Sequence, residues 1–280
     1  MNILEQISPN KPLVMAVLNI TPDSFSDGGE LFDRGKPQID RILTRAEVLL
    51  ESGADILDVG GESTRPGAVA PEIQEELDRV APVVEALWQQ FGCDISVDTS
   101  RAPVMRQAMQ SGAKLINDVR ALIEPESLTA ALDTGAEVCL MHMQGNPGSM
   151  QHNPQYTDSV VEVKQYLQTR LEVCIAAGID QKKICIDPGF GFGKSHKHNM
   201  QLIVNLGQFK EMGLPLLVGV SRKGMIGEIT GKAIASRLAG SLAMAQIALE
   251  GGANIIRAHD VAETCDMIRV WAAVKQLQEG

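Results

Sequence analysis

The sequence predicts an α/β protein with one domain, a (β/α)8 barrel that spans residues 1–280. Three observations indicate this fold. Amphipathic segments alternate with short apolar runs along the whole chain, small residues mark most of the junctions between them, and no Pro- or Ser-rich linker divides the sequence. Eight such units fit within 280 residues, which is the size expected of a single barrel.

The junctions between the units share one pattern, a glycine and an alanine placed before an apolar run. The clearest examples are Gly53-Ala54, Gly112-Ala113, Gly135-Ala136 and Gly252-Ala253. Glycine suits the end of a helix because it readily adopts the left-handed backbone conformation of a C-terminal cap. The runs that follow are apolar without strict alternation, as expected for parallel strands covered on both faces.

The first half of the chain supplies four units. Strands are expected at residues 13–19, 54–59, 93–98 and 114–118, because each of these runs is apolar and has polar or glycine boundaries. Helices are expected between them at 40–51, 74–90 and 102–111, where apolar residues recur with the helical period.

The second half repeats this arrangement. Strands are expected at 136–142, 183–187, 215–220 and 254–258. Seven helical segments in all separate the eight strands, including 157–177 and 234–249, and an eighth at about 262–278 follows the last strand. An open, doubly wound sheet is the alternative fold, although it usually has fewer strands and no GxGxxG motif follows the first strand.

The composition disfavours several classes of function. Lys and Arg number 25 against 35 Asp and Glu, a formal net charge of −10, so neither nucleic acid nor an anionic membrane is expected as a general partner. Aromatic residues make up only 4%, too few for a platform that stacks single-stranded bases. No apolar run approaches the roughly 20 residues that cross a bilayer.

The cysteines and the first residues indicate the compartment. The five cysteines are scattered and form no CxxC pair, which is typical of reduced thiols. Glu5 and Pro9 occur where a signal peptide would have a basic start and an apolar run. We therefore expect a cytoplasmic protein.

Polar residues gather where the strands end, and this is where a (β/α)8 barrel binds its ligand. Asp98, Asn117 and Asp187 end the third, fourth and sixth strands. Two carboxylates and an amide can bind a flat heterocycle that displays several N–H donors. A cyclic guanidine edge, as in guanine or pterin, pairs with a carboxylate through two parallel hydrogen bonds. The aspartates could instead cap the helices that follow them.

Five cations also lie in the segments that follow strands. They are Arg65, Lys194, Arg222, Lys223 and Arg257. Gathered on one rim, they would form a positive pocket suited to a phosphate or pyrophosphate beside the last two strands. The planar guanidinium of Arg257 could also stack on a flat ring. Each cation could alternatively be ordinary solvated surface charge.

Other catalytic motifs are not matched. The segment 189–194 lacks the spacing of a phosphate-binding P-loop, and 219–224 misses GxSxG by one residue. The five histidines lack the spacing of a transition-metal site. A loosely held Mg²⁺ needs only one or two protein oxygens, and Asn19 could supply one. The segments after the first two strands could close over a substrate or form surface turns.

Together these segments resemble the dihydropteroate synthase family. The matching phrases are NITPDSFSDGG at 19–29, GGESTRPG at 60–67, DPGFGFGK at 187–194, SRK at 221–223 and RAHD at 257–260. They run in order along nearly the whole chain. The resemblance implies a transferase of folate biosynthesis that condenses 6-hydroxymethyl-7,8-dihydropterin pyrophosphate with para-aminobenzoate. The products would be 7,8-dihydropteroate and pyrophosphate, and sulfonamides would inhibit the enzyme.

The resemblance also implies roles for single residues. The catalytic residues would be Asp98, Asp187, Lys223 and Arg257, with Asn117 completing the site for the pterin edge. Arg257 would stack on the ring and, with His259 and Asn19, hold the leaving diphosphate, and Asn19 would also contact the cofactor Mg²⁺. The remaining substrate-binding residues, mostly in the para-aminobenzoate pocket, would be Phe25, Asp27, Thr64, Arg65, Pro66, Met141, Phe192 and Ser221.

Two other functions remain open. A corrinoid methyltransferase domain that uses methyl-tetrahydrofolate would share the pterin-edge residues. It would lack the phrases at 64–66 and 190–192, and it would need a cobalamin partner. A non-catalytic barrel would have lost the charged residues that end the strands here. The resemblance also implies a homodimer. The helices expected at 234–249 and 262–277 carry apolar residues that could dock a second copy or could cover the barrel.

Overall fold

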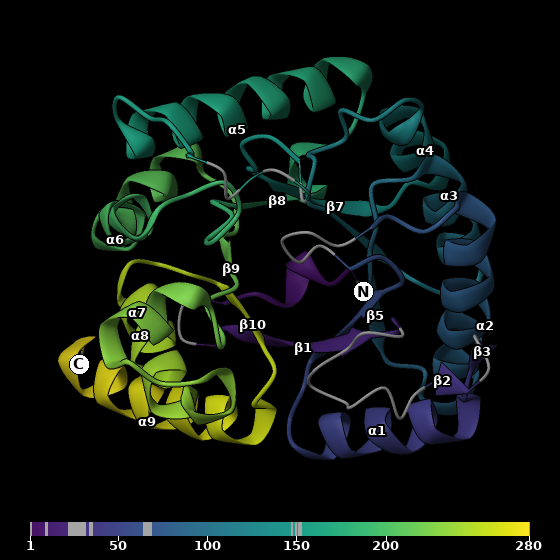
Figure 1. Ribbon diagram of the computed structural model, residues 1–280, viewed down its shortest axis with the longest axis horizontal. Helices are drawn as coiled ribbons and strands as arrows, with labels where there is room; N and C mark the ends of the chain where they lie inside the picture. Colours follow the sequence, from purple (N-terminus) through teal and green to yellow (C-terminus); the bar gives the residue numbers. More distant parts are fainter. Residues whose placement is uncertain are drawn as a thin grey trace.

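The predicted (β/α)8 barrel is confirmed. A computed structural model describes residues 2–8, 11–21, 32–33, 36–63, 69–146, 148, 150 and 153–279. Eight parallel strands form one sheet in the order β8-β7-β6-β5-β4-β1-β10-β9, and helices surround the sheet (Figure 1). The two ends of the sheet meet where the N–H of Ile186 donates to the carbonyl of Pro215 at 3.0 Å.

The strands agree closely with those expected from the sequence. They are β1 (Leu13–Asn19), β4 (Ile56–Gly60), β5 (Asp94–Asp98), β6 (Leu115–Asp118), β7 (Glu137–Met141), β8 (Ile184–Asp187), β9 (Leu217–Val218) and β10 (Ile255–Ala258). Only β9 is much shorter than expected, in part because Pro215 has no N–H to donate to a neighbouring strand. A separate two-stranded sheet comprises β2 (Phe32–Asp33) and β3 (Lys36–Pro37).

Helices follow the strands as expected, with one addition. They are α1 (Ile39–Glu51), α2 (Ile73–Phe91), α3 (Ala102–Gln110), α4 (Ser127–Thr134), α5 (Ser159–Ala177), α6 (His196–Val204), α7 (Gly224–Thr230), α8 (Leu238–Glu250) and α9 (Val261–Glu279). The short α7 was not expected as a separate helix, and a 3-10 turn at Ile234–Ser236 precedes α8. None of the described helices is both long and apolar enough to cross a membrane.

The glycine at each predicted junction has the expected backbone conformation. Gly53, Gly112, Gly135 and Gly252 all have positive φ angles. Gly112 also meets a close neighbour, because a Cβ added there would lie 2.5 Å from Cγ of Trp88. The junction after α3 therefore requires glycine for two reasons, its left-handed backbone and its contact with α2.

The barrel interior changes from apolar to polar along the strands. Its lower part is a cluster of buried residues that includes Ile56, Leu115, Cys185 and Ile255. Side chains two positions apart face the same side of a strand. The residues two positions after these four are Asp58, Asn117, Asp187 and Arg257, so they also face the interior, and all four are polar. They lie toward the carboxyl ends of the strands. We call these four, together with Asn19 and Asp98 at the ends of β1 and β5, the mouth layer.

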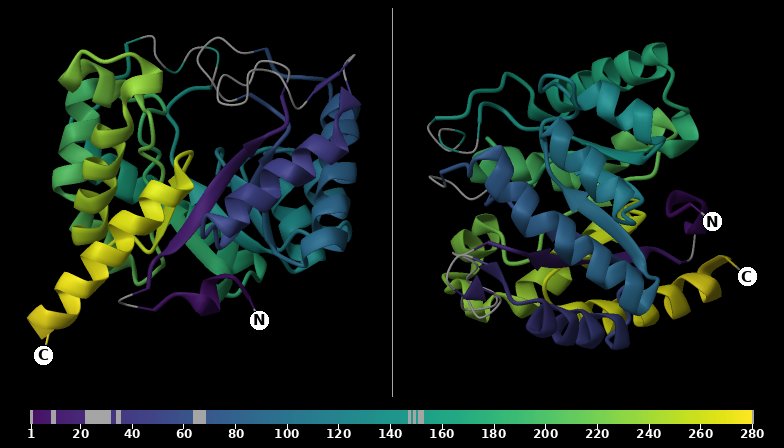
Figure 2. Two further views of the ribbon diagram at one scale, coloured as in Figure 1. Left: turned by 90° about the horizontal axis from the view of Figure 1, so that it is seen from below. Right: turned by 90° about the vertical axis from the view of Figure 1, so that its right-hand side faces the viewer.

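The opposite end of the barrel is closed by the start of the chain. Ile3 and Leu4 are buried against the apolar cluster of the interior, and the Glu137 carboxylate accepts their backbone N–H groups at 2.7 and 2.8 Å. Figure 2 shows this N-terminal segment across the end where the strands begin. The barrel consequently opens at one end only, the end that carries the mouth layer.

Candidate functional site

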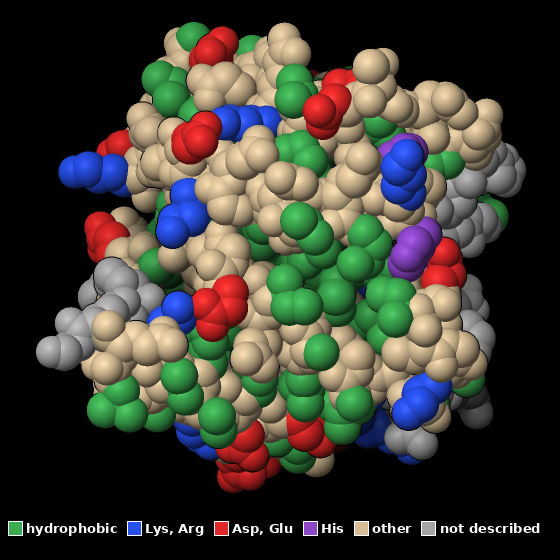
Figure 3. All heavy atoms as spheres, turned by 90° about the vertical axis from the view of Figure 1, so that its left-hand side faces the viewer, with side chains coloured by type: hydrophobic (Ala, Val, Ile, Leu, Met, Phe, Trp, Pro, Cys, Tyr) green, Lys and Arg blue, Asp and Glu red, His purple; other side chains and the backbone are tan. Residues whose placement is uncertain are grey.

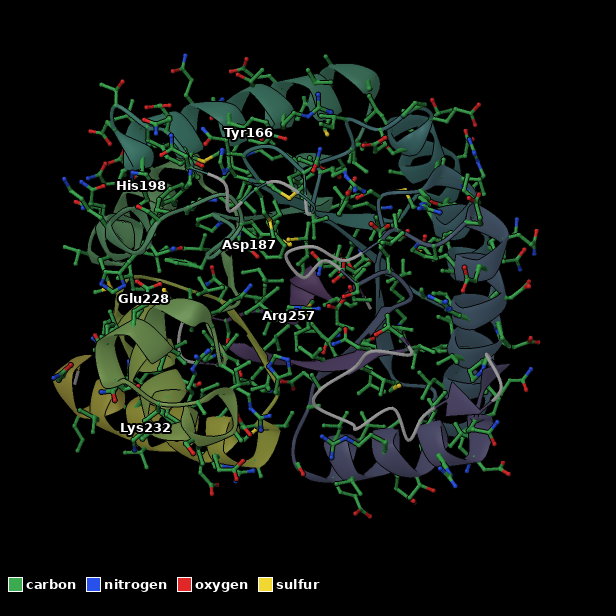
Figure 4. All side chains as sticks on the ribbon, viewed as in Figure 1. Tyr166, Asp187, His198, Glu228, Lys232 and Arg257 are labelled. Carbon is green, nitrogen blue, oxygen red and sulfur yellow. The ribbon has the colours of Figure 1, made fainter. Side chains whose placement is uncertain are left out.

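The predicted pterin-edge residues come together in the mouth layer. Asp98 and Asn117 are neighbours in the register of β5 and β6, and Asp187 ends β8. All three side chains are buried. Figure 4 shows Asp187 and Arg257 near the centre of the ring of strands. The prediction that these residues converge from separate strands is confirmed.

Arg257 links two carboxylates of this layer. Its Nε donates to Oδ2 of Asp58 at 2.6 Å, and its Nη2 donates to Oδ2 of Asp98 at 3.0 Å. Asn117 Nδ2 also donates to Asp58, at 3.3 Å. Asp58 was missed in the sequence because it lies inside an apolar run. Its distance of two residues from Ile56 is the signal that places it on the interior face.

The buried carboxylates have unusual proton affinities. Burial and the neighbouring Asp58 raise the pKa of Asp98 to about 7, although Arg257 opposes the shift. Burial raises the pKa of Asp187 to about 6, partly offset by the N–H of Gly189, which donates to it at 2.7 Å. Asp98 accepts a hydrogen bond from Arg257 and Asp187 accepts one from Gly189, and a ligand that brings further N–H donors would stabilise their ionised forms.

Lys223 and Phe192 lie together beside this layer. The Nζ of Lys223 lies 4.3 Å from the centroid of the Phe192 ring. Burial, and secondly Arg257, lower the pKa of Lys223 to about 8. Gly191 leaves room for the lysine, because an added Cβ would be only 3.4 Å from its Cδ. Asp187 is among the charges that act on Lys223, so the lysine lies close to the mouth layer.

Met141 lies on an apolar wall of the same opening. It pairs in register with Asp187, and it forms a buried cluster with Val119, Met143 and Met150, against which Phe192 packs. The family resemblance implied Met141 and Phe192 but not the other three. Such a wall suits the face of a flat ring, whereas the carboxylates suit its polar edge.

Ser221 and His259 are hydrogen-bonded to each other at the ends of β9 and β10. The Ser221 Oγ lies 3.1 Å from Nδ1 of His259 and accepts the backbone N–H of His259 at 3.2 Å. Burial and then Arg257 lower the pKa of His259 to about 3, so the ring is neutral at physiological pH. Arg222, by contrast, forms a two-point ion pair with Asp260, with N–O distances of 3.0 and 2.5 Å.

Lys194 is not on the rim, and that part of the sequence interpretation is wrong. Its side chain is buried, and its ammonium donates to the carbonyls of Gly189 and Phe192 at 2.8 and 2.9 Å. The lysine lies beneath the loop that follows β8. Its position depends on contacts with residues distant in the sequence, which no local pattern indicates.

Asn19 ends β1 beside Gly60, on the adjacent strand. A Cβ at Gly60 would lie 3.4 Å from Oδ1 of Asn19 and 3.6 Å from Cβ of Asp98, so glycine allows these two side chains to share the opening. Within the residues that the structure describes, no group of three or more His, Cys, Asp and Glu side chains could hold a metal ion. The predictions for Phe25, Asp27, Thr64, Arg65 and Pro66 lie outside the described residues.

Comparisons with known proteins agree with this site. Residues 15–259 match the family described as pterin binding enzyme. Dihydropteroate synthase of Haemophilus influenzae is 51% identical over 262 residues, which are 94% of each chain. The Yersinia pestis enzyme, solved with a sulfonamide drug, has a TM-score of 0.91 and 49% identity over 97% of this chain and 96% of that one.

The same enzyme from Xanthomonas albilineans has been solved with 4-aminobenzoic acid, with a TM-score of 0.87 and 47% identity over 95% of this chain and 94% of that one. Fold, site and family match together define a pterin-binding (β/α)8 barrel. The curated relatives and the solved structures narrow this class further. The chain belongs to the dihydropteroate synthases, the transferases that make dihydropteroate in folate biosynthesis.

The raised pKa values predict how pterin binding depends on pH. A carboxylate must be ionised to accept two N–H groups from the pterin edge, and Asp98 and Asp187 take up protons near pH 7 and 6. The affinity for a pterin whose ring keeps its N–H donors over this range, 6-hydroxymethyl-7,8-dihydropterin, should therefore be greatest near pH 8 and fall at least about tenfold by pH 5.5. Isothermal titration calorimetry across this range would measure the dissociation constant.

Thermal unfolding at each pH provides the control that the protein stays folded. A dissociation constant that is unchanged from pH 8 to pH 5.5 would contradict the assigned protonation of these carboxylates. Ordinary aspartates, which titrate near pH 4, would produce no change in this range.

Proposed function

We propose that the mouth layer carries out the reaction of this family, the condensation of 6-hydroxymethyl-7,8-dihydropterin pyrophosphate with para-aminobenzoate. The observation that carries the assignment is the convergence of Asp98, Asn117 and Asp187, all buried, in one layer. The cyclic guanidine edge of a pterin supplies N–H donors in the plane that such carboxylates require. The apolar wall that contains Met141 would cover one face of the ring.

Arg257 would change partners when the pterin binds. In the ligand-free protein it occupies Asp98, the group that the pterin edge requires. We expect Nη2 to leave Asp98 while Nε stays on Asp58, so that the guanidinium turns onto the face of the ring. Asp58 thus serves as an anchor, and Arg257 reaches both the pterin and the diphosphate.

The chemistry is a displacement at the pterin methylene carbon. The bond from that carbon to the diphosphate oxygen breaks, the arylamine nitrogen forms the new bond, and the amine loses a proton. An arylamine is a weak nucleophile, so the departure of the diphosphate needs the greater assistance. Arg257 and the neutral, donating ring of His259 would stabilise the charge that develops on the diphosphate. Asp98 and Asp187 would favour the electron-poor methylene carbon.

The opening fits one Mg²⁺ bound mainly by the substrate. The carboxamide oxygen of Asn19 faces the same opening as Asp98, and a hard oxygen of this kind is a suitable protein ligand for the ion. When bound, Mg²⁺ would neutralise charge on the departing diphosphate. The residues of the chain would position the diphosphate through Arg257 and His259.

The para-aminobenzoate would lie between Phe192, Lys223 and Ser221. The ammonium of Lys223 and the hydroxyl of Ser221 can bind a carboxylate, and Phe192 offers an aromatic face. By the resemblance in the sequence, Thr64, Arg65 and Pro66 would complete this pocket, and Phe25 and Asp27 would close it against water. A sulfonamide has the shape of the aminobenzoate, and the Yersinia pestis complex with such a drug supports the same binding here.

A pyrophosphate-release assay with both substrates tests the proposal. Asp187→Asn removes a charge from the pterin site and Lys223→Met removes the ammonium, so each should lower kcat/KM by about 10²-fold or more. Lys232→Met alters an exposed lysine in the segment after α7 and should leave the rate unchanged. A sulfonamide in the same assay should raise the KM for para-aminobenzoate and leave kcat unchanged.

Full activity of Asp187→Asn and Lys223→Met would overturn the assignment of the site. Turnover of methyl-tetrahydrofolate with a corrinoid acceptor, in place of pyrophosphate release, would favour the methyltransferase alternative. Absence of both activities in the folded wild-type protein would favour a non-catalytic barrel.

The role of Asn19 predicts a metal dependence. Chelation with EDTA should slow the reaction strongly, and added Mg²⁺ should restore it. Asn19→Ala should raise the Mg²⁺ concentration needed for half-maximal rate by about tenfold. Calorimetry of pyrophosphate binding with and without Mg²⁺ gives a second measurement. If the metal strengthens pyrophosphate binding equally in Asn19→Ala and in the wild type, Asn19 is not a ligand.

We also propose that the enzyme is a homodimer that pairs through α8 and α9. A groove of about 450 Å³ runs between these helices and is lined by Leu242, Met267, Val270, Trp271 and Val274, among others. Figure 3 shows apolar side chains gathered on the side of the molecule that these helices cover. Val270 and Val274 are 67% and 52% exposed, which is unfavourable in an isolated monomer.

A charge in this groove should prevent pairing. Val270→Glu should give a monomer in sedimentation equilibrium at concentrations where the wild type is a dimer, because an unpaired carboxylate cannot be buried without a large cost. Val161→Glu, at an exposed valine of α5 on another face, provides a matched control. A wild-type monomer, or a Val270→Glu variant that remains dimeric, would contradict this interface.

The free cysteines support the proposal of a cytoplasmic protein. All five are unpaired, and Cys139 and Cys185 remain thiols although they are neighbours in the register of β7 and β8. The hydrogen bond with Cys185, and secondly burial, hold the pKa of Cys139 well above its ordinary value. Reduced, protonated thiols of this kind persist in a reducing compartment, and cell fractionation is the direct check.

A further inference from the structure

Lys194 is a buried cation that the reaction does not use. Its side chain is 2% exposed, so it contacts neither substrate. The ammonium lies 2.8 Å from the carbonyl oxygen of Gly189, 2.9 Å from that of Phe192 and 3.2 Å from that of His142. It also lies 2.9 Å from Nδ1 of His142. Every one of these partners can accept a hydrogen bond, so they form a built site for one ammonium group.

The electrostatics agree with this geometry. Burial and then Lys194 lower the pKa of His142 to about 2, so its ring is neutral and Nδ1 can accept. Burial also lowers the pKa of Lys194 to about 7, opposed by Asp187. A buried ammonium costs several kcal/mol unless its hydrogens are used. The burial of the Lys194 ammonium is therefore favourable only while the loop and the segment after β7 keep these acceptors around it.

The ammonium joins two segments that touch closely. Two of its carbonyl partners belong to the loop after β8, residues 188–194, and His142 follows β7. Gly189 has a φ of +69°, and a Cβ there would lie 2.0 Å from the carbonyl oxygen of His142. The loop thus lies directly on the β7 segment. Lys194 fastens it there from below, while Asn199 and Tyr156 bind its other peptide groups at 2.7 and 2.9 Å.

The two functional residues of this segment do not depend on Lys194 equally. Asp187 is held by the sheet, because its carbonyl accepts the N–H of His142 at 3.0 Å and it pairs in register with Met141. Phe192 has no such ladder, and its own carbonyl is bound by Lys194. The Asp187 carboxylate also accepts the N–H of Gly189, but the backbone of Asp187 is fixed by β7 and not by the loop. Loss of the ammonium would therefore displace the Phe192 ring from Lys223 more than it displaces Asp187.

We infer that Lys194 is a positioning residue for the para-aminobenzoate site, which it serves by fixing Phe192 against Lys223 without contact with either substrate. This inference rests on the proposed function, and it adds a residue that determines the geometry of one substrate pocket and not of the other. The strands thus position the pterin site, whereas a buried cation positions the para-aminobenzoate site.

The test is a double-mutant cycle between Lys194 and Phe192. Lys194→Met retains the apolar stem and removes the ammonium. It should raise the KM for para-aminobenzoate at least about tenfold, because small displacements of a binding group have large effects. The dissociation constant for 6-hydroxymethylpterin should change less than about threefold. In a Phe192→Ala background, Lys194→Met should cause little further change in KM, since the lysine acts through that ring.

Lys197→Met, at an exposed lysine three residues further on, is the matched control and should match the wild type. If Lys194→Met does not fold, Lys194→Leu, which also lacks the ammonium, takes its place in the cycle. Equal losses at both substrate sites, additive effects with Phe192→Ala, or no effect on KM would each overturn the inference. A wild-type protein that releases no pyrophosphate would instead overturn the proposed function.

Discussion

The buried contact of Arg257 with Asp58 and Asp98 is the interaction on which the site depends. Two carboxylates in one dry layer repel each other, and a cation between them makes their shared burial tolerable. The compensation is incomplete, because the pKa of Asp98 remains near 7. On the proposed function, a ligand that supplies further N–H donors would release Arg257 to bind the diphosphate. Binding of the pterin and preparation for the chemistry would then be two parts of one exchange of partners.

The remainder of the fold makes that exchange possible by keeping the surroundings fixed. The apolar lower layer and the N-terminal segment fill the barrel beneath the carboxylates, so solvent reaches them from the mouth only. The strand register sets Asp98 beside Asn117. The loop after β8 is fastened at successive peptide groups. On the proposed function, a fixed frame with one guanidinium that changes partners would couple binding to catalysis.

Much of this architecture could be predicted from the sequence, for a physical reason. Parallel strands covered on both faces are apolar runs, and 54–59 and 254–258 are visible as such. The same property hid Asp58, which interrupts an apolar run without breaking it. The helix α7 escaped prediction because seven residues, two of them glycines, are too short to display a period. Lys194 was misplaced because its neighbour His142 is 52 residues away.

For other residues, the position at the end of a strand was enough to predict where the side chain lies. Asp98, Asn117 and Asp187 could be predicted together because the ends of parallel strands meet at one edge, whatever the loops do. Phe192 and Lys223 also meet, although only the family resemblance suggested it. The roles of Phe25, Asp27, Thr64, Arg65 and Pro66 stay predictions, since those positions fall outside the described residues.

The ion pair between Arg257 and Asp58 spans 199 residues of the 280-residue sequence. During synthesis, Asp58 and Asp98 leave the ribosome long before the cation that compensates them. Domains fold as units, and contacts of such long range form late. Until β10 pairs with β1, Asp58 and Asp98 lack the cation that compensates their charge, so burying them is unfavourable. A partly formed barrel therefore cannot keep the mouth layer buried. The pairing of β10 with β1 consequently completes the barrel and assembles the charged site in one step, so only a fully folded chain has the complete site.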